Sequence, residues 1–246
     1  MFYGDFRDGR RRKVREAIDT LRSAFDPVWA NDNLIALGRN QSFLWDEKFR
    51  QALKANANTP QEKSLAWRFH TLCWAGRRAL SLPGDFVECG VWRGVSFAVV
   101  TDYLDFATVP KTLYLYDTFE GIPAAYNSEN LSNAVYAKEP DLHDKVVARF
   151  AKYPNVRIVK GVVPDTFAEV VPETISLLHI DMNSSAAEVA ALEVLYDRVV
   201  PGGVIVLDDF GWRPYVRQTV AEIDFMERRG VPILESPTGQ GIVVKP

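Results

Sequence analysis

The sequence predicts an α/β fold built on a doubly wound, mostly parallel sheet. From residue 85 onward, short apolar runs alternate with stretches of helical periodicity, which is the order expected of βαβ units. The C-terminal region carries two more apolar runs, VPILES and GIVVKP, joined by Pro237-Thr238-Gly239-Gln240. A connection of that length joins antiparallel strands, so at least one of the last two strands runs against the others.

Five apolar runs are the predicted parallel strands, at residues 85–89, 112–116, 155–159, 175–180 and 203–207. The intervening patterns predict helices near residues 95–105, 141–152, 185–199 and 214–229. Pro201-Gly202-Gly203 ends the third helix and turns the chain into the last parallel strand.

The first third of the chain is predicted to be a helical N-terminal extension or cap, residues 1–84, followed by the main domain at residues 85–246. Within the main domain, segment 118–140 is polar, interrupted by Pro and Gly, and without a period. An insertion of this length after a strand is often a lid over a site, and the alternative is a solvated loop. The helical stretch near residues 64–82 is apolar around most of its circumference, which predicts packing against the sheet or a homodimer or higher homo-oligomer.

The composition limits which classes of protein the chain can belong to and which partners it can bind. A chain of 246 residues with 47% hydrophobic residues can bury one good core. The net charge of −3 comes from interspersed charges without a basic stripe, which excludes nucleic acid as an expected partner. We see neither the apolar core of a signal peptide nor a run of about 20 apolar residues, so we expect a cytoplasmic protein with no membrane partner. Cys73 and Cys89 lie in apolar contexts, as buried reduced thiols do.

Three aspartates stand where apolar runs end. Asp181 follows the run at 175–180, and Asp208 and Asp209 follow the run at 203–207. Neighbouring strands lie about 5 Å apart, and their carboxyl ends form the ligand-binding edge of such sheets. Three carboxylates at that range either share a proton or hold a hard cation such as Mg²⁺ or Ca²⁺. The alternative is that Asp208 caps the next helix and Asp181 is a solvated turn residue.

A glycine-containing loop follows the first parallel strand in FVECGVWRGVSF. Glu88 ends the strand, Gly90 and Gly94 allow a tight turn close to a ligand, and Ser96 opens a helix whose free N–H groups favour an anion. The spacing differs from the G-x-G-x-x-G of dinucleotide sites, and an acid here would repel a pyrophosphate but attract an ammonium or sulfonium. S-adenosylmethionine carries both cations and a carboxylate. A purely structural turn is the alternative.

Several other residues are candidates for the same site. Asp117 ends the next strand, where an acid can accept hydrogen bonds from a ribose diol. His143 is the histidine candidate for a general base, although its context favours an exposed residue without that role. His179, inside an apolar run, is predicted to be a core residue. Trp92 and Arg93 either close over the methionine part of a donor or pack against the loop. Trp212 and Tyr215, which follow the acid pair, are candidates for an apolar wall facing the acceptor or for core packing.

At this point the chain resembles class I S-adenosylmethionine-dependent methyltransferases, and more narrowly the macrocin O-methyltransferase family, which acts on sugar hydroxyls of glycosylated natural products. The resemblance extends from about Trp67 to Pro246 and rests on VECGVWRG, YDTFEGIP, the KG at 160–161, HIDMN and RVVPGGVIVLDDFGW. It implies a Rossmann-like, seven-stranded sheet with a reversed last strand.

The resemblance also implies a set of site residues. Mg²⁺ would be held by Asp181, Asp208 and Asp209, and the donor would be bound at Glu88, Gly90, Asp117 and the region after Gly161. From the residues themselves, either Asp181 or His143 is the candidate base. The residues expected to bind the donor are Glu88, Gly90, Trp92, Arg93, Gly94, Ser96, Asp117, Thr118, Gly161, Val162 and Asp181. Family members commonly carry a second acid and a tyrosine where this chain has Asn183 and Ser184, which leaves the acceptor open.

The resulting hypothesis is an S-adenosylmethionine- and Mg²⁺-dependent O-methyltransferase acting on a sugar or phenolic hydroxyl of a small molecule. A bound divalent ion would lower the pKa of that hydroxyl and fix its position. The alternatives are a metal-independent methyltransferase and a non-catalytic protein that retains the fold. A nicotinamide-dependent dehydrogenase would share the sheet, but it would require the tighter glycine pattern or a Tyr-x-x-x-Lys pair, and the sequence contains neither.

Overall fold

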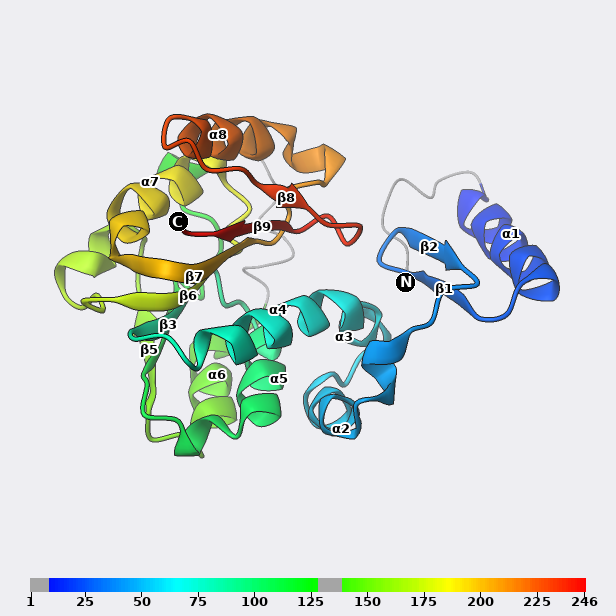
Figure 1. Ribbon diagram of the computed structural model, residues 1–246, viewed down its shortest axis with the longest axis horizontal. Helices are drawn as coiled ribbons and strands as arrows, with labels where there is room; N and C mark the ends of the chain where they lie inside the picture. Colours follow the sequence, from blue (N-terminus) through cyan, green and yellow to red (C-terminus); the bar gives the residue numbers. More distant parts are fainter. Residues whose placement is uncertain (1–8, 128–138) are drawn as a thin grey trace.

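The computed structural model describes residues 9–127 and 139–246, and its centre is a seven-stranded sheet in the order β5-β4-β3-β6-β7-β9-β8 (Figure 1). The strands are β3 (Asp85–Cys89), β4 (Leu113–Asp117), β5 (Val156–Lys160), β6 (Ile175–Ile180), β7 (Val199–Leu207), β8 (Leu234–Glu235) and β9 (Gly241–Val244). Strands β3 to β7 are parallel, and β9 is antiparallel to both of its neighbours, β7 and β8. The predicted parallel sheet and reversed last strand are therefore confirmed.

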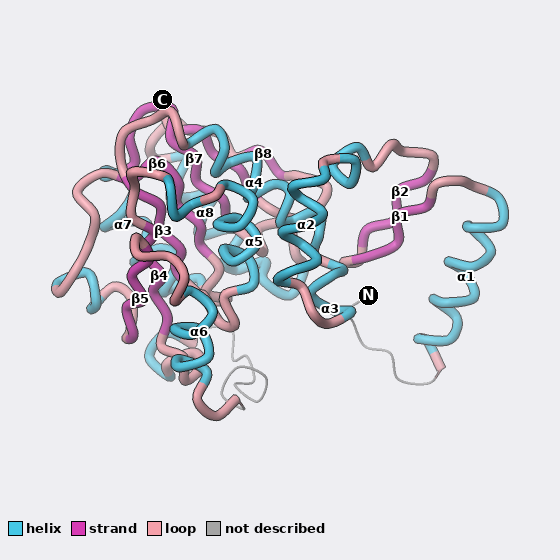
Figure 2. Tube along the Cα trace, turned by 90° about the horizontal axis from the view of Figure 1, so that it is seen from below, coloured by secondary structure: helices cyan, strands magenta, loops and turns pink. Residues whose placement is uncertain are grey.

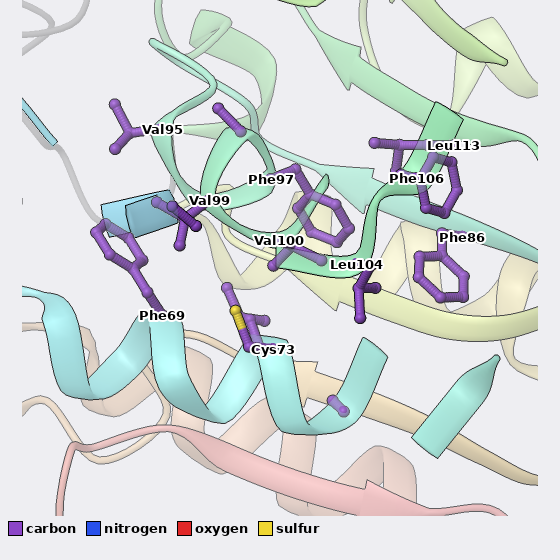
Figure 3. Close-up of a cluster of buried hydrophobic side chains, with 14 of the residues drawn as sticks. Phe69, Cys73, Phe86, Val95, Phe97, Val99, Val100, Leu104, Phe106 and Leu113 are labelled. Atoms are coloured by element: carbon purple, nitrogen blue, oxygen red, sulfur yellow. The ribbon is translucent and has the colours of Figure 1, made fainter. Parts of the chain in front are cut away.

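Helices cover both faces of this sheet. One face is covered by α4 (Ala66–Ala79), α5 (Val95–Leu104) and α6 (Leu142–Phe150), with α2 (Glu47–Asn56) packed on α5, and the other face by α7 (Ser185–Leu195) and α8 (Val216–Glu227). Because successive strand residues point to opposite faces, Phe86 joins the first core while Val87 joins the second. Figure 3 shows the first core, where Phe69 and Cys73 of α4 meet the apolar face of α5.

Helix starts in this fold follow from local capping. The side chain of Asp46 accepts a hydrogen bond from the backbone N–H of Phe49 at the start of α2. Thr59 and Glu62 form a capping box at α3 (Pro60–Ser64). The remaining short 3-10 helices span Ser42–Trp45, Phe106–Thr108, Ala124–Tyr126, Asp165–Ala168, Tyr196–Arg198 and Arg213–Tyr215.

The N-terminal region is not wholly helical, which corrects the expectation for residues 1–84. After α1 (Arg10–Ala24) comes a hairpin, β1 (Val28–Asn31) and β2 (Leu34–Leu37). Its turn residues Asp32 and Asn33 both have positive φ, 52° and 53°, as a two-residue type I′ turn requires. Figures 1 and 2 both show the hairpin and α1 beside the sheet rather than on either face.

Two other expectations concern the proposed lid and the two cysteines. Of the proposed lid at 118–140, residues 128–138 lie outside the described residues, so the prediction is tested only at its two ends. Both cysteines are buried free thiols, as predicted. Among the helices that the structure describes, none combines the length and apolar character needed to cross a bilayer.

Candidate active site

A cavity of about 1120 Å³ opens at the carboxyl ends of β3, β4, β6 and β7. Its walls come from the loop after β3, from the ends of β4 and β6, from α3 and α4, and from α1 and the hairpin turn. Strand β3 is the point where the sheet order reverses, with β4 on one side and β6 on the other. Ligands bind at this position in open α/β sheets, and the volume accommodates a cofactor-sized molecule.

Asp117 holds the glycine loop in place. Its Oδ2 accepts hydrogen bonds from the backbone N–H groups of Val91 and Trp92, both at 2.7 Å, and its Oδ1 accepts one from Phe119 at 2.6 Å. Trp92 has a positive φ of 45°, so these hydrogen bonds stabilise a backbone conformation that a tryptophan seldom adopts. The acid at the end of β4 therefore shapes the loop at the end of β3.

Most of the predicted donor-binding residues face the cavity. They are Gly90, Trp92, Arg93, Ser96, Asp117, Thr118, Gly161, Val162 and Asp181. Gly94 is not among the lining residues, because it starts α5 and packs against the ring of Phe150. Arg93 lies over the Trp92 ring, with 4.5 Å between its guanidinium carbon and the ring centroid, and it pairs with Glu139 at the far end of the proposed lid.

Glu88 lies beneath the cavity rather than in its wall, which corrects the expectation of a direct contact with the donor. It is 1% exposed and absent from the lining residues. Its Oε1 is 3.1 Å from Nδ1 of His179. Burial raises the pKa of Glu88 to about 7, although His179 opposes that shift.

The three aspartates stand at the carboxyl ends of two neighbouring strands, β6 and β7. Strands β6 and β7 are neighbours with Ile180 opposite Leu207, and the backbone N–H of Asp208 donates to the carbonyl of Ile180 at 3.0 Å. The side chains of Asp181, Asp208 and Asp209 all line the cavity. The geometry therefore supplies a group of oxygen ligands of the kind that hard cations prefer.

Arg68 of α4, which the sequence analysis did not identify, pairs with this acid group. Its Nη1 lies 2.5 Å from Asp208 Oδ2 and 2.9 Å from Asp209 Oδ1. Its Nε lies 2.7 Å from Asp32 Oδ2 in the hairpin turn. The guanidinium also lies 4.8 Å from the Trp212 ring centroid. The sequence contains one indication of this role: Arg68 is the single charged residue, counting Lys, Arg, Asp and Glu, between positions 64 and 76.

His179 is a buried residue, as predicted, but it is also part of the electrostatic arrangement. Its Nδ1 faces Glu88, and its Nε2 lies 3.5 Å from Asp208 Oδ1. Burial lowers the pKa of His179, but Asp208 and Glu88 outweigh that effect and raise it to about 10. His179, Asp181 and Asp208 present ligand atoms within 4.8 Å of one another, yet a protonated imidazole has no lone pair for a metal.

The acids differ in their electrostatic environments. Burial, together with Asp208 and Asp209, raises the pKa of Asp181 well above its ordinary value. Burial would raise the pKa of Asp208 as well, but Arg68 and His179 lower it below its ordinary value. Burial raises the pKa of Asp209 to about 6 against the opposing effect of Arg68. Asp208 is therefore held as a carboxylate by Arg68 and His179, whereas Asp181 and Asp209 take up a proton more readily than ordinary aspartates do.

His143 does not face the cavity, which corrects its assignment as a candidate base. It neighbours Asp144, with 3.3 Å between Nδ1 and Oδ1, and its ring meets Phe119 edge-on at 5.2 Å. The preceding residue, Leu142, lines the cavity. Because successive residues on an α-helix are turned by about 100°, residue 143 is directed elsewhere.

Asn183 and Ser184, which follow Asp181, have local roles in this chain. The amide of Asn183 is 3.5 Å from Asp181 Oδ1. Ser184 caps α7 by accepting a hydrogen bond from Ala187, and its hydroxyl donates to the carbonyl of Tyr126. These contacts connect the beginning of the proposed lid to the end of β6. Tyr215 and Trp212 line the cavity near the acid pair.

Comparison with known proteins identifies the family of the chain. The family model "Macrocin-O-methyltransferase (TylF)" matches residues 71–234. The mycinamicin III 3''-O-methyltransferase of Micromonospora griseorubida is 28% identical over 163 residues, which cover 61% of this chain and 63% of that protein. The 8-demethyl-8-(2,3-dimethoxy-alpha-L-rhamnosyl)-tetracenomycin-C 4'-O-methyltransferase of Streptomyces olivaceus is 31% identical over 147 residues, which cover 52% of this chain and 54% of that protein.

The chain thus matches somewhat over half of the length of these two relatives. The solved structure of the O-methyltransferase NovP superposes with a TM-score of 0.62 at 19% identity, covering 96% of this chain and 98% of that one. That likeness, at such low identity, concerns the fold. Since the family model spans more than half of the sequence, this chain belongs to the macrocin O-methyltransferase family.

Proposed function

We propose that this chain is an S-adenosylmethionine-dependent O-methyltransferase that acts on a hydroxyl of a small molecule, either a sugar or another natural-product hydroxyl. The observation that carries the proposal is a single cavity lined both by the glycine loop and by the acid group Asp181, Asp208 and Asp209. A methyl donor on the loop and an acceptor beside the acids would be held within reach of each other.

The loop side of the cavity suits the donor. Gly90 lets the backbone come close to a ligand, and the first turn of α5, which contains Ser96, presents unpaired backbone N–H groups to a carboxylate. Asp117 can accept ribose hydroxyls as well as the loop amides, because a carboxylate has about four acceptor sites. Methyl transfer is an in-line displacement, so the contribution of these residues is to orient the sulfonium and exclude water.

The acid side suits a divalent cation. Among the described residues, the basic groups that pair with Asp32, Glu88, Asp208 and Asp209 are Arg68 and His179, so acids outnumber bases within this buried group. Asp181, Asp208 and Asp209 would hold Mg²⁺. When bound, the ion lowers the pKa of an acceptor hydroxyl and fixes its oxygen. Asp181, which faces the cavity where His143 does not, is the proposed proton acceptor.

The acceptor is proposed from the relatives and from the remaining walls. By their names, the two relatives methylate the 3''-oxygen of mycinamicin III and the 4'-oxygen of a rhamnosyl-tetracenomycin. In this chain, Trp212 and Tyr215 form one wall beside the acids, and Leu65 and Phe69 of the α3–α4 region form another. Apolar and aromatic walls around a few polar groups suit the face of a sugar or a phenolic ring. We expect the enzyme to act as a homo-oligomer, as the sequence predicts.

A metal-independent methyltransferase is the second candidate. It is favoured by one observation, the pairing of Arg68 with Asp208 and Asp209, because a resident guanidinium already neutralises two of the three acids. In that case Asp181 alone would act on the acceptor. A non-catalytic protein with this fold would have no need for an open cavity lined by both sets of residues.

Two measurements on the purified chain test the proposal. S-adenosylhomocysteine should raise the melting temperature, while NADH should leave it unchanged. With a glycosylated acceptor, S-adenosylhomocysteine should accumulate, accumulation should stop after EDTA treatment, and Mg²⁺ should restore it. Undiminished turnover in EDTA would identify the metal-independent enzyme. If S-adenosylhomocysteine does not stabilise the chain, the donor assignment fails.

A further inference from the structure

We propose that Arg68 is a built-in cation that competes with a divalent metal for Asp208 and Asp209, and that it couples metal binding to the N-terminal hairpin through Asp32. The inference rests on the proposed metal site. It adds a residue from outside the sheet whose position depends on whether that site is filled. The hairpin residues Ala30, Asn31 and Asp32 line the cavity, so the coupling would reach the acceptor side of the site.

The geometry makes the competition direct. Nη1 of Arg68 bridges Asp208 Oδ2 at 2.5 Å and Asp209 Oδ1 at 2.9 Å, so it occupies the space between the two carboxylates. The other oxygen of Asp208 accepts a hydrogen bond from Gln240 Nε2 at 2.8 Å and also faces His179. Both oxygens of Asp208 are therefore in use. A metal that binds between the two aspartates, at the oxygens that Arg68 now contacts, requires Arg68 to withdraw.

Because Arg68, Asp208 and Asp209 are buried, the site favours one cation at a time, either the guanidinium or the divalent ion. The side chains of Arg68, Asp208 and Asp209 are 8%, 12% and 14% exposed, so water screens their charges little. If Arg68 simply left, two buried carboxylates would remain uncompensated, which is strongly unfavourable. If a divalent ion entered while Arg68 stayed, two cations would repel each other across the same short distance. Each cation is therefore stable in the site only when the other is elsewhere.

Asp32 determines where Arg68 can go. Its two oxygens accept hydrogen bonds from Nε of Arg68 at 2.7 Å and from Nη2 at 3.3 Å, a two-point contact on the side of the guanidinium away from the acid pair. A guanidinium expelled from the acid pair can keep this contact by moving with the hairpin turn. Because Asp32 is itself buried at 7% exposure, that movement must repack β1 and β2. Metal binding is thus linked to the hairpin conformation, and by reciprocity the hairpin is linked to metal affinity.

The first test measures Mn²⁺ binding to the full chain by calorimetry, without donor or acceptor. Arg68→Gln should bind Mn²⁺ roughly tenfold or more tightly than the unmodified chain, since the competing cation is gone. Arg78→Gln, an exposed change on the same helix, should bind with unchanged affinity. If folded Arg68→Gln binds Mn²⁺ no more tightly than the unmodified chain, the competition is refuted. If none of the three proteins binds Mn²⁺, the proposed metal site itself fails, and the competition fails with it.

The second test follows amide hydrogen exchange in residues 28–37 and does not depend on the Arg68 variant being stable. In the unmodified chain, saturating Mn²⁺ should accelerate exchange in the hairpin. In Asp32→Asn the contact with Arg68 is weakened, so exchange should be fast already and Mn²⁺ should change it little. Two results would contradict the coupling. One is hairpin exchange that does not respond to Mn²⁺ in the unmodified chain, and the other is an equal response in Asp32→Asn.

Discussion

The backbones of Gly90 and Asp181 are in direct contact: a Cβ atom on residue 90 would lie 1.9 Å from the carbonyl oxygen of Asp181. The N–H of Asp181 in turn donates to the carbonyl of Cys89 at 2.8 Å. The loop proposed to hold the donor and the first acid of the proposed metal site therefore form one rigid unit across β3 and β6. In the proposed enzyme, this contact would keep the methyl group and the acceptor at a fixed separation.

Gly90→Ala should disrupt that unit. The new methyl group cannot coexist with the Asp181 carbonyl, and residue 90 also has a positive φ of 91°. We expect a loss of about 3 kcal/mol or more in the free energy of unfolding, measured by urea denaturation. Gly230→Ala is the matched control, because Gly230 has a φ of 66° and nothing within 4 Å of the added atom. It should lose only about 1–2 kcal/mol, the conformational term alone. Equal losses in the two variants would show that the contact with Asp181 is unimportant.

Asp117→Asn should weaken donor binding. An amide replaces one carboxylate oxygen with an N–H₂ group, which cannot accept the loop hydrogen bonds made to that oxygen, and it removes the charge that strengthens those made to the other. Calorimetry with S-adenosylhomocysteine should show roughly a tenfold to hundredfold loss of affinity, since two or more hydrogen bonds to a charged group are affected. Asp144→Asn is the control, because the Asp144 side chain is 82% exposed, and it should bind S-adenosylhomocysteine with the affinity of the unmodified chain. Unchanged affinity in Asp117→Asn would place the donor elsewhere.

His143 and Asp181 should differ sharply in catalysis. Asp181→Asn removes the proposed proton acceptor and should lower the turnover number by roughly a hundredfold or more. His143→Gln changes a side chain outside the cavity wall and should keep turnover within about threefold of the unmodified chain, since surface changes away from a site have small effects. Steady-state rates of S-adenosylhomocysteine formation give the comparison. A large loss in His143→Gln with little loss in Asp181→Asn would reverse the assignment.

Much of the framework was predictable because it depends on local patterns. The strands were found within a few residues since each is a short apolar run between turn residues, and the convergence of Asp181 with Asp208 and Asp209 followed from the parallel order alone. The loop residues Gly90 and Asp117 were likewise placed by their positions at strand ends.

The features that were missed depend on contacts between distant segments. Arg68 meets Asp208 across 140 positions of sequence, and no local pattern specifies that pairing. Glu88 was expected to face the donor because it ends a strand, but the alternation of side chains directs it to His179 on the neighbouring strand. The hairpin at residues 28–37 was overlooked, although its Asp32-Asn33 turn and short apolar runs are typical hairpin signals.

A buried acid behind the site should make stability depend on pH. Glu188 of α7 and Glu222 of α8 are both 0% exposed and interact with each other. Burial raises the pKa of Glu222 from 4.5 to about 7, against the opposing effect of its neighbour Glu188. Between these two values the folded chain keeps a proton that the unfolded chain loses, so stability falls as the pH rises. The full difference corresponds to about 3 kcal/mol.

The variant Glu222→Gln isolates this contribution, since its amide has no proton to lose. From pH 5 to pH 8, the free energy of unfolding of the unmodified chain should fall by about 3 kcal/mol more than that of Glu222→Gln. Urea denaturation at the two pH values provides the comparison. Glu227→Gln, at an exposed position of the same helix, should retain the pH dependence of the unmodified chain. Identical pH dependence in Glu222→Gln and the unmodified chain would show that Glu222 keeps its ordinary pKa.

The most direct test of the whole account is a crystal structure of the chain with S-adenosylhomocysteine and Mn²⁺, using anomalous scattering to locate the metal. We predict the nucleoside and its sulfur against Gly90 and Asp117, with one anomalous peak within about 2.3 Å of oxygens from Asp181, Asp208 and Asp209. The guanidinium of Arg68 should then have moved from the acid pair toward Asp32. Arg68 still bridging Asp208 and Asp209 at saturating Mn²⁺, with no anomalous peak beside them, would contradict the proposed metal site.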